Sequence, residues 1–150
     1  MPRYQATVRS SWSAPDTFNY MATFSNAAQW DPGVTAAEQL DPGPLRVGSR
    51  FRLQVKFGGR SMPLTYEITS CDPPHSVVLS AANGLLRSVD RISVTPAGDG
   101  ATVSYDADVR LRGPLSVLDP LMVKGFQIVA QRAVAGLTQA LASAQPSTRS

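Results

Sequence analysis

The stretch DPLMVKGFQIVAQRAVAGLTQALAS, residues 119–143, decides the fold of this chain. Its apolar residues recur at steps of three and four, which predicts a helix with one apolar face. Asp119 suits the N-cap, and Pro120 suits the first helical position, where a missing N–H costs nothing. Such a helix is roughly 36 Å long at 1.5 Å per residue, so it can lie across a small sheet. The apolar face consists of Met122, Phe126, Val129, Ala133, Leu137 and Leu141.

The chain before this helix alternates between apolar and polar residues, which is typical of strands. A first strand is predicted from Tyr4 to Trp12. One short helix opens at Ser13-Ala14-Pro15-Asp16, and a second covers Asn26 to Trp30 before Asp31-Pro32-Gly33 stops it. Six further strands follow. The order predicts an α+β fold in which a curved seven-stranded antiparallel sheet surrounds the long C-terminal helix, with two short helices after strand 1.

Turn residues predict how these strands pair. Gly58-Gly59 and Asn83-Gly84 each suit a two-residue hairpin turn, and another turn falls near residues 97–100. Most of the resulting pairs set apolar residues opposite apolar residues, which supports the register. The pairs are Val55–Met62, Leu53–Leu64, Phe51–Tyr66, Ala81–Leu86, Leu79–Ser88, Val77–Asp90, Val94–Val103 and Ile92–Tyr105.

This register assigns each strand residue to one of two faces of the sheet. A slip of one residue would reverse every assignment on the affected strand. The predicted buried face carries Phe51, Leu53, Leu64, Tyr66, Leu79, Ile92 and Tyr105, and the predicted exposed face carries Arg50, Arg52, Glu67, Arg91 and Asp106.

Length and composition indicate one globular domain, residues 1–143, followed by a disordered tail over residues 144–150. The chain has 150 residues, of which 43% are hydrophobic and 17% charged. No apolar run approaches the roughly 20 residues that span a bilayer, and the N-terminus has no apolar signal core. We therefore expect a cytoplasmic protein without stable membrane insertion. The net charge is +3, but the basic residues are scattered, so we expect no nucleic-acid partner.

Four short motifs resemble the START/polyketide-cyclase superfamily, which has the helix-grip fold. They occur in the order of that family along nearly the whole chain. The resemblance implies a curved antiparallel sheet that grips the C-terminal helix around a cavity, usually for an apolar small molecule. It carries no catalytic signature. The motifs are Ala14-Pro15-Asp16-Thr17-Phe18, Trp30-Asp31-Pro32-Gly33-Val34, Val47-Gly48-Ser49-Arg50-Phe51, and Gly113-Pro114-Leu115 leading into Asp119-Pro120.

Residue types that carry catalysis or bind metals are scarce. His75 is the only histidine and follows Pro73-Pro74 in a strand connection, which favours a surface turn residue over a catalytic base. Cys71 is the only cysteine and has no basic neighbour in sequence, which favours a small core residue over a nucleophile. One His and one Cys do not make a metal site, and no glycine-rich phosphate loop is present. We expect no catalytic residue, metal or cofactor.

Inward-facing residues are the candidates for a binding site, because a sheet curved around a helix leaves space where the two diverge. Pockets of this kind are mostly apolar, hold a few polar groups, and have volumes of a few hundred Å³ or more. For each apolar candidate the alternative is core packing. The candidate ligand-binding residues are Phe51, Leu53, Val55, Tyr66, Leu79, Ser88, Asp90 and Tyr105 from the sheet, Met122, Phe126 and Val129 from the helix, and Trp30 near the entrance.

Ser88 and Asp90 are the most informative of these, because they are polar on an otherwise apolar face. Parity with Ile92 and Val94 turns the Asp90 side chain inward. A carboxylate there needs a hydrogen-bonding partner, or its pKa rises above about 3.9. The alternatives are a structural hydrogen bond and a group that orients a ligand or accepts a proton.

Three functions are compatible with these features of the sequence. The first is a non-catalytic binder or carrier of a hydrophobic small molecule, such as a lipid, polyketide or aromatic metabolite. The second is an enzyme of the cyclase/aromatase type, in which a few polar groups move protons. The third is an interaction protein with a vestigial cavity. The low number of titratable residues on the inward face favours the first over the second. Neither the ligand nor the oligomeric state follows from the sequence.

Overall fold

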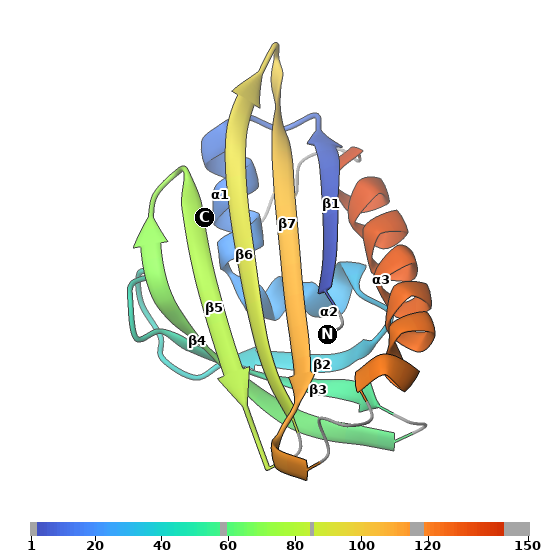
Figure 1. Cartoon of the computed structure of the whole chain (residues 1–150). Coiled ribbons are helices and arrows are strands. Elements are labelled where there is room, and N and C mark those ends of the chain that lie inside the picture. Colours follow the sequence, from blue (N-terminus) through green and yellow to red (C-terminus); the bar gives the residue numbers. More distant parts are fainter. Residues whose placement is uncertain (1–2, 58–59, 85, 115–118, 143–150) are drawn as a thin grey trace.

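The chain folds into a seven-stranded antiparallel sheet with helices beside it (Figure 1). The computed structural model describes residues 3–57, 60–84, 86–114 and 119–142, and their side chains except those of Arg3, Phe57 and residues 119–126. The strands follow the order β1-β7-β6-β5-β4-β3-β2 across the sheet. They are β1 (Arg3–Ser10), β2 (Val34–Gln39), β3 (Arg50–Phe57), β4 (Arg60–Asp72), β5 (Ser76–Ala82), β6 (Leu86–Ala97) and β7 (Gly100–Leu111).

The helices between β1 and β2 cover one face of the sheet. They are α1 (Ala14–Ala22), the short 3-10 helix η1 (Phe24–Asn26) and α2 (Ala27–Trp30). The hydroxyl of Ser13 caps α1 by accepting a hydrogen bond from the backbone N–H of Asp16 at 3.3 Å. Helix α1 packs against β6 and β7 and lies behind them in Figure 1. It buries Phe18 and Met21 in the core.

The C-terminal helix α3 (Asp119–Ala142) packs along β1 and against α2 (Figure 1). Its end is tied to the end of β1, because the carbonyl of Leu141 accepts a hydrogen bond from the backbone N–H of Ser11 at 3.0 Å. Helices α2 and α3 approach closely at Gly136, where a Cβ atom would lie 2.0 Å from the carbonyl oxygen of Trp30. Only glycine fits there.

The predicted helix boundaries agree with α3, but its buried face is shifted. Leu137 and Leu141 are buried, as predicted, and Ala130 is buried as well. Val129 was expected to face the sheet but is 46% exposed. The buried face is shifted because α3 packs against β1 and α2. In this position the side of α3 that carries Ala130 and Leu137 faces the sheet. The side chains of Asp119, Met122 and Phe126, and the predicted tail, residues 144–150, lie outside the described residues.

Two of the three predicted hairpin registers are confirmed. The β3–β4 pairs include Val55–Met62, Leu53–Leu64 and Phe51–Tyr66, and the β6–β7 pairs include Ile92–Tyr105 and Val94–Val103.

The predicted β5–β6 register is wrong by two residues. Ala82 pairs with Arg87, and the backbone N–H of Asn83 donates to the carbonyl of Leu86 at 3.0 Å, so the turn lies one residue later than predicted. The Asn83 side chain closes this connection, because its Oδ1 accepts the backbone N–H of Leu86 at 2.9 Å. Asp90 therefore lies opposite Leu79, and Ser88 opposite Ala81. A shift of two preserves the face of every residue.

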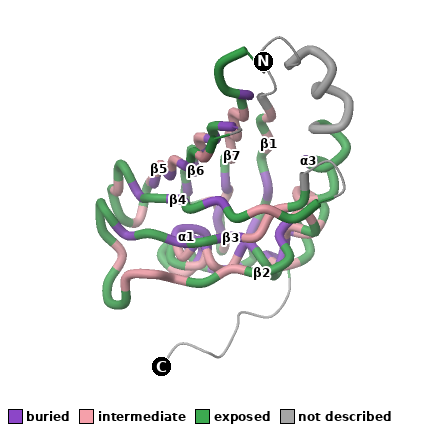
Figure 2. Tube along the Cα trace, turned by 90° about the horizontal axis from the view of Figure 1, so that it is seen from below, coloured by how far each residue is buried: buried purple, intermediate pink, exposed green. Residues whose placement is uncertain are grey.

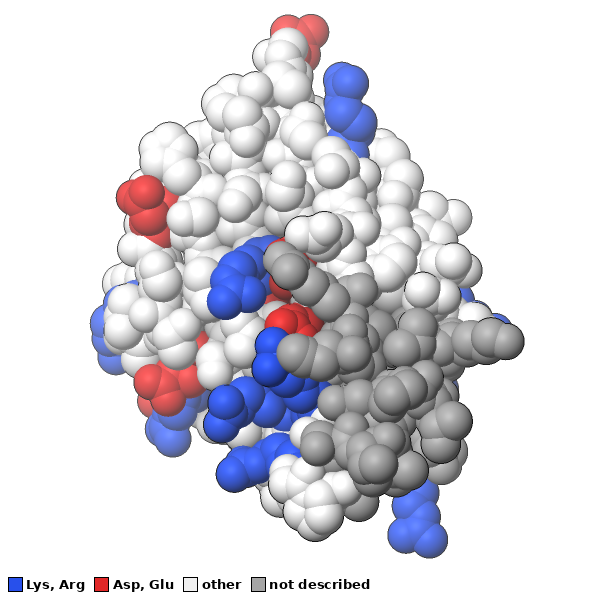
Figure 3. All heavy atoms as spheres, viewed as in Figure 1, with Lys and Arg blue, Asp and Glu red and all other residues white. Residues whose placement is uncertain are grey.

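Both predicted faces of the sheet are confirmed. Buried and exposed residues alternate along the strands (Figure 2). Phe51, Leu53, Leu64, Tyr66, Leu79 and Ile92 are buried and Tyr105 is half-buried, whereas Arg50, Arg52, Glu67 and Arg91 are exposed and Asp106 is half-buried. Figure 3 shows the side of the molecule turned away from α1, where charged side chains of both signs gather.

Candidate functional site

A cavity of about 130 Å³ lies where the sheet, α2 and α3 meet. Its volume is smaller than the few hundred Å³ that we expected. The walls combine small apolar side chains with a few polar ones. The lining residues are Tyr4 and Val8 of β1, Trp30, Asp31, Tyr66 of β4, Ser88 and Asp90 of β6, Tyr105, Ala107 and Val109 of β7, and Val129, Ala130, Ala133, Val134 and Leu137 of α3.

A chain of hydrogen bonds ends on Asp90 in this cavity. Asp90 is 5% exposed, and its Oδ1 accepts the hydroxyl of Ser88 at 3.0 Å. The hydroxyl of Tyr66 donates in turn to Ser88 Oγ at 3.1 Å. On the other oxygen, Asp90 Oδ2 accepts the hydroxyl of Tyr105. The inward orientation predicted for Asp90 is thus confirmed, and its carboxylate has the hydrogen-bonding partners that its burial requires.

Burial sets the protonation of this network. It raises the pKa of the Asp90 carboxyl from 3.8 to about 6, although the hydrogen bonds from Tyr105 and Ser88 lower it. The negative charges of Asp31 and Asp106 add to the rise. Burial, followed by the charge of Asp90, raises the pKa of Tyr66 and Tyr105 well above 10.0. At neutral pH both tyrosines are therefore neutral donors, and Asp90 is largely ionised.

Asp31 is a second carboxylate in the cavity wall. It follows the end of α2, and its Oδ1 accepts the backbone N–H of Gly33 at 2.8 Å. Burial raises the pKa of Asp31, opposed by that hydrogen bond. The sequence placed Asp31 in a helix stop and in one of the four family-like motifs, but it was not among the predicted ligand-binding residues. Its position directly after Trp30, a candidate site residue, was the available signal.

The structure brings six of the twelve predicted ligand-binding residues together around the cavity: Trp30, Tyr66, Ser88, Asp90, Tyr105 and Val129. Their contact with a ligand stays a prediction. Four others, Phe51, Leu53, Val55 and Leu79, lie away from this cavity. The side chains of Met122 and Phe126 are outside the described residues.

Helix packing explains why the β3 residues do not reach the cavity. Phe24 of η1 packs edge-on against Tyr66, with ring centroids 4.9 Å apart, and η1 also contacts β3. This short helix packs against β3, and Phe51 and Leu53 are buried in the hydrophobic core. The missed lining residues Tyr4 and Val8 lie on β1, whose pairing with β7 places the start of the chain at the edge of the sheet beside the cavity.

Trp30 and Val129 define two sides of the cavity. Trp30 was expected near the entrance, but it is 6% exposed, and its ring packs edge-on against Tyr105 with centroids 5.7 Å apart. Val129 both lines the cavity and is 46% exposed, so it marks an open side. Gly33 lies next to it, since a Cβ there would be 3.5 Å from Val129 Cγ1.

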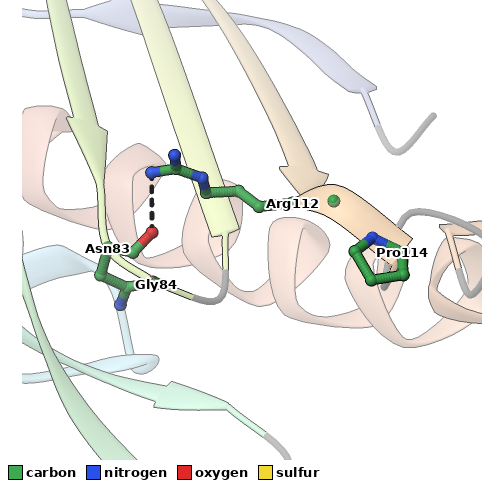
Figure 4. Close-up of a pocket in the computed structure, with 5 residues that line it drawn as sticks. Asn83, Gly84, Arg112 and Pro114 are labelled. Carbon is green, nitrogen blue, oxygen red and sulfur yellow. Dashed lines mark hydrogen bonds between the residues drawn. The ribbon is translucent and has the colours of Figure 1, made fainter.

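Two larger hollows lie on the surface near Arg112. One, of about 510 Å³, is lined by Asn83, Gly84, Arg112, Gly113 and Pro114 (Figure 4). The other, of about 320 Å³, is lined by Arg87, Arg110, Leu111, Arg112 and Gly113. Arg112 Nη1 donates to the carbonyl of Asn83 at 3.0 Å between the two strand ends. The described residues that line these hollows come from strand ends and the segment after β7, whereas the inner cavity is lined from the sheet, α2 and α3 together, so the inner cavity is the better candidate.

The described residues offer little for other chemistry. They contain no group of three or more His, Cys, Asp or Glu arranged to hold a metal ion. His75 is exposed, as predicted. Burial raises the pKa of the Cys71 thiol, and the charge of Asp72 adds to this, which makes it less reactive. No helix in the described ranges is both long and apolar enough to cross a membrane.

The sequence matches a known family over nearly its full length. The sequence model of the family described as polyketide cyclase/dehydrase and lipid transport matches residues 1–142. No curated protein matches the chain in sequence.

Solved structures share the fold at low sequence identity. A START superfamily protein from Mycobacterium smegmatis is 19% identical with a TM-score of 0.74, covering 93% of this chain and 96% of that one. The di-domain ARO/CYC BexL from the BE-7585A biosynthetic pathway is 19% identical with a TM-score of 0.70, over 96% of this chain and 50% of that one. The Zhui aromatase/cyclase from a Streptomyces species is 15% identical with a TM-score of 0.62, covering 91% of this chain and 93% of that one. At these identities the likeness shows the fold alone.

Proposed function

The chain belongs to the polyketide cyclase/dehydrase and lipid transport family, and we propose that it binds a hydrophobic small molecule in the cavity beside α3. The observation that carries this proposal is the cavity itself, with apolar walls and a buried polar cluster on one side. Small-molecule sites have this composition, since apolar walls supply affinity and a few polar groups fix orientation.

The cavity volume bounds the part of the ligand that it encloses. An engineered cavity of about 150 Å³ lined by apolar side chains binds benzene, and this one has about 130 Å³. We therefore propose that a ring-sized group occupies it, as an aromatic metabolite or one ring of a polyketide would supply. The cytoplasmic location expected from the sequence stays a prediction.

Titration with toluene, a ring-sized apolar probe, tests this function. We expect saturable one-to-one binding in ligand-observed NMR. Val129→Trp places a large ring on the open side of the cavity, so it should weaken binding at least about tenfold. Val129 is 46% exposed, so the protein tolerates the larger side chain.

Ile128→Trp is the matched control. Ile128 is the preceding residue of α3, is 51% exposed and does not line the cavity, so the same ring there should leave toluene affinity unchanged. If toluene does not bind the wild-type protein, or if both variants weaken binding equally, the proposed site is wrong.

A cyclase-type enzyme is the second candidate, and the observation that favours it is Asp90. A carboxylate whose pKa is raised to about 6 is a stronger base than an ordinary aspartate and still largely ionised at pH 7. In this role Asp90 would accept a proton from an acidic carbon of the ligand and leave an enolate. Deuterium exchange at such a carbon, catalysed by the wild-type protein and lost in Asp90→Asn, would distinguish the enzyme from the carrier.

A further inference from the structure

The charged groups in the cavity wall all have the same sign. Asp31 and Asp90 line it, and no Lys, Arg or His is among the described lining residues. The charges that act on Asp90 are those of Asp31 and Asp106, and both are negative. An ionised carboxylate buried without a cation is unfavourable. Among the described lining residues, no positive charge therefore compensates these carboxylates at neutral pH.

The hydrogen bonds that join Tyr66, Ser88, Asp90 and Tyr105 leave acceptor lone pairs free, and no donor hydrogens. An ionised Asp90 can only accept, so Ser88 and Tyr105 must use their hydroxyl hydrogens on it. With the Ser88 hydrogen committed, Tyr66 must donate its own to Ser88 Oγ. What these groups still offer to a ligand is lone pairs, and a molecule that donates hydrogen bonds fits them.

Asp31 adds a further acceptor on the other side of the cavity. Its Oδ1 accepts the Gly33 N–H at 2.8 Å, and no hydrogen bond reaches its Oδ2 from the described residues. Trp30 and Tyr4 also line the cavity, and neither side chain supplies a positive charge. An anionic ligand would find these side chains but no positive charge among the described lining residues.

Aromatic rings beside the carboxylates favour the same kind of ligand. Trp30 and Tyr105 both line the cavity, with centroids 5.7 Å apart. Indole and phenol faces attract cations within about 6 Å. The remaining described wall, which includes Val8, Ala107 and Ala130, is apolar and suits a hydrocarbon ring.

We infer that the cavity selects a ring-sized apolar molecule that bears a protonated amine, with the nitrogen turned toward Asp90 and Asp31. This inference rests on the proposed binding function and names its ligand class. A protonated amine supplies both the donors and the charge that the network lacks. Fatty acids and other apolar anions are disfavoured, because they would add a negative charge to a negative cavity.

Three probes with the same ring and a short polar arm test the inference at pH 7.5: 2-phenylethylamine, 2-phenylethanol and phenylacetate. By isothermal titration calorimetry, the amine should bind at least about tenfold more tightly than the alcohol, since charge-assisted hydrogen bonds are the stronger kind. Phenylacetate should bind most weakly. Asp90→Asn and Asp31→Asn should each reduce this preference for the amine and leave affinity for the alcohol nearly unchanged.

Asp99→Asn is the control for net charge. Asp99 is exposed in the β6–β7 turn, outside the cavity, so the variant should keep the preference. Thermal unfolding identifies any variant that does not fold, and the comparison of probes on the wild-type protein needs no variant. If the alcohol or phenylacetate binds as tightly as the amine, the inference is overturned while the binding function stands. If neither toluene nor any of the three probes binds, both fail.

Discussion

Asp90 is the residue at which the inner face of the sheet differs most from an ordinary core. At 5% exposure its carboxylate has lost most of its hydration, and two hydroxyl donors replace only part of it. Since its pKa is about 6, the folded protein nevertheless carries the charge at pH 7. A buried charge that destabilises the free protein is typical of a functional site.

The raised pKa predicts how Asp90 changes stability with pH. The folded state binds the proton of the Asp90 carboxyl more tightly than the unfolded state. The stability that this proton contributes is therefore fully present below pH 3.8 and is lost as pH rises through about 6. A change in pKa from 3.8 to about 6 corresponds to roughly 3 kcal/mol. In urea unfolding between pH 4 and 7, the stability of wild type relative to Asp90→Asn should fall by up to that amount.

Asp41 provides a control of opposite sign. A hydrogen bond from the side chain of Arg50, with N and O atoms 3.0 Å apart, lowers the pKa of Asp41. Its contribution to stability is present above the unfolded pKa and is lost as pH falls. The stability of wild type relative to Asp41→Asn should therefore decrease toward acid pH. Parallel pH curves for wild type and Asp90→Asn would contradict the assignment of Asp90.

The contact between α2 and α3 determines where Trp30 lies. Gly136 of α3 faces the carbonyl oxygen of Trp30 so closely that an added Cβ would lie 2.0 Å from it. Because that neighbour is backbone, the two helices must separate to admit any side chain. The wall formed by Trp30 would move with them, so this contact sets the shape of the cavity.

Gly136→Ala should therefore destabilise the protein, although glycine to alanine in a helix normally stabilises by about 1 kcal/mol. We expect a lower midpoint of urea unfolding and weaker binding of toluene. Ala135→Gly is the control: Ala135 is exposed in the same turn, so this change should cost only the helix propensity of about 1 kcal/mol and leave binding unchanged. A stabilised Gly136→Ala variant would show that the helices do not meet as described.

Local sequence patterns predicted the helices and strands better than they predicted the contacts between elements far apart in the sequence. The β3–β4 register followed from Gly58-Gly59 and the alternation of apolar residues, because a tight turn fixes the pairing that follows it. At Asn83-Gly84 the predicted turn was misplaced by one residue, because Asn83 bonds to Leu86 through both its backbone N–H and its side-chain Oδ1. Parity still placed Ser88 and Asp90 correctly on the inner face.

The rest of the site depends on contacts between the two ends of the chain. Asp31 and Val8 line the cavity because β1 pairs with β7 and α2 meets α3. No periodicity within one element encodes such pairings. The same reason explains why Phe51 and Leu53 were expected in a cavity wall that they do not line, since η1 packs on β3 only in the folded molecule.

At the scale of the whole molecule, the cavity joins parts of the chain that are far apart in sequence. Its wall runs from Tyr4 near the start to Leu137 near the end, through four strands and two helices. A ligand that fits this wall contacts elements that must all be in place for the site to exist. Binding should therefore stabilise the fold as a whole, by an amount that depends on the ratio of ligand concentration to Kd.

The amine inferred above should stabilise the fold in a pH-dependent way. At pH 7.5 and a concentration of 100 times its Kd, 2-phenylethylamine should add about 2.7 kcal/mol, which raises Tm by roughly 5–10 °C for a chain of this size. With a pKa of about 6, Asp90 is about 90% protonated at pH 5, while an aliphatic amine remains charged. The same amine concentration should then give about half the shift, since a tenfold loss of affinity leaves about 1.4 kcal/mol. The shift produced by 2-phenylethanol should not depend on pH, because it does not rely on the charge of Asp90. Equal shifts by the amine at both pH values would mean that Asp90 is not its partner.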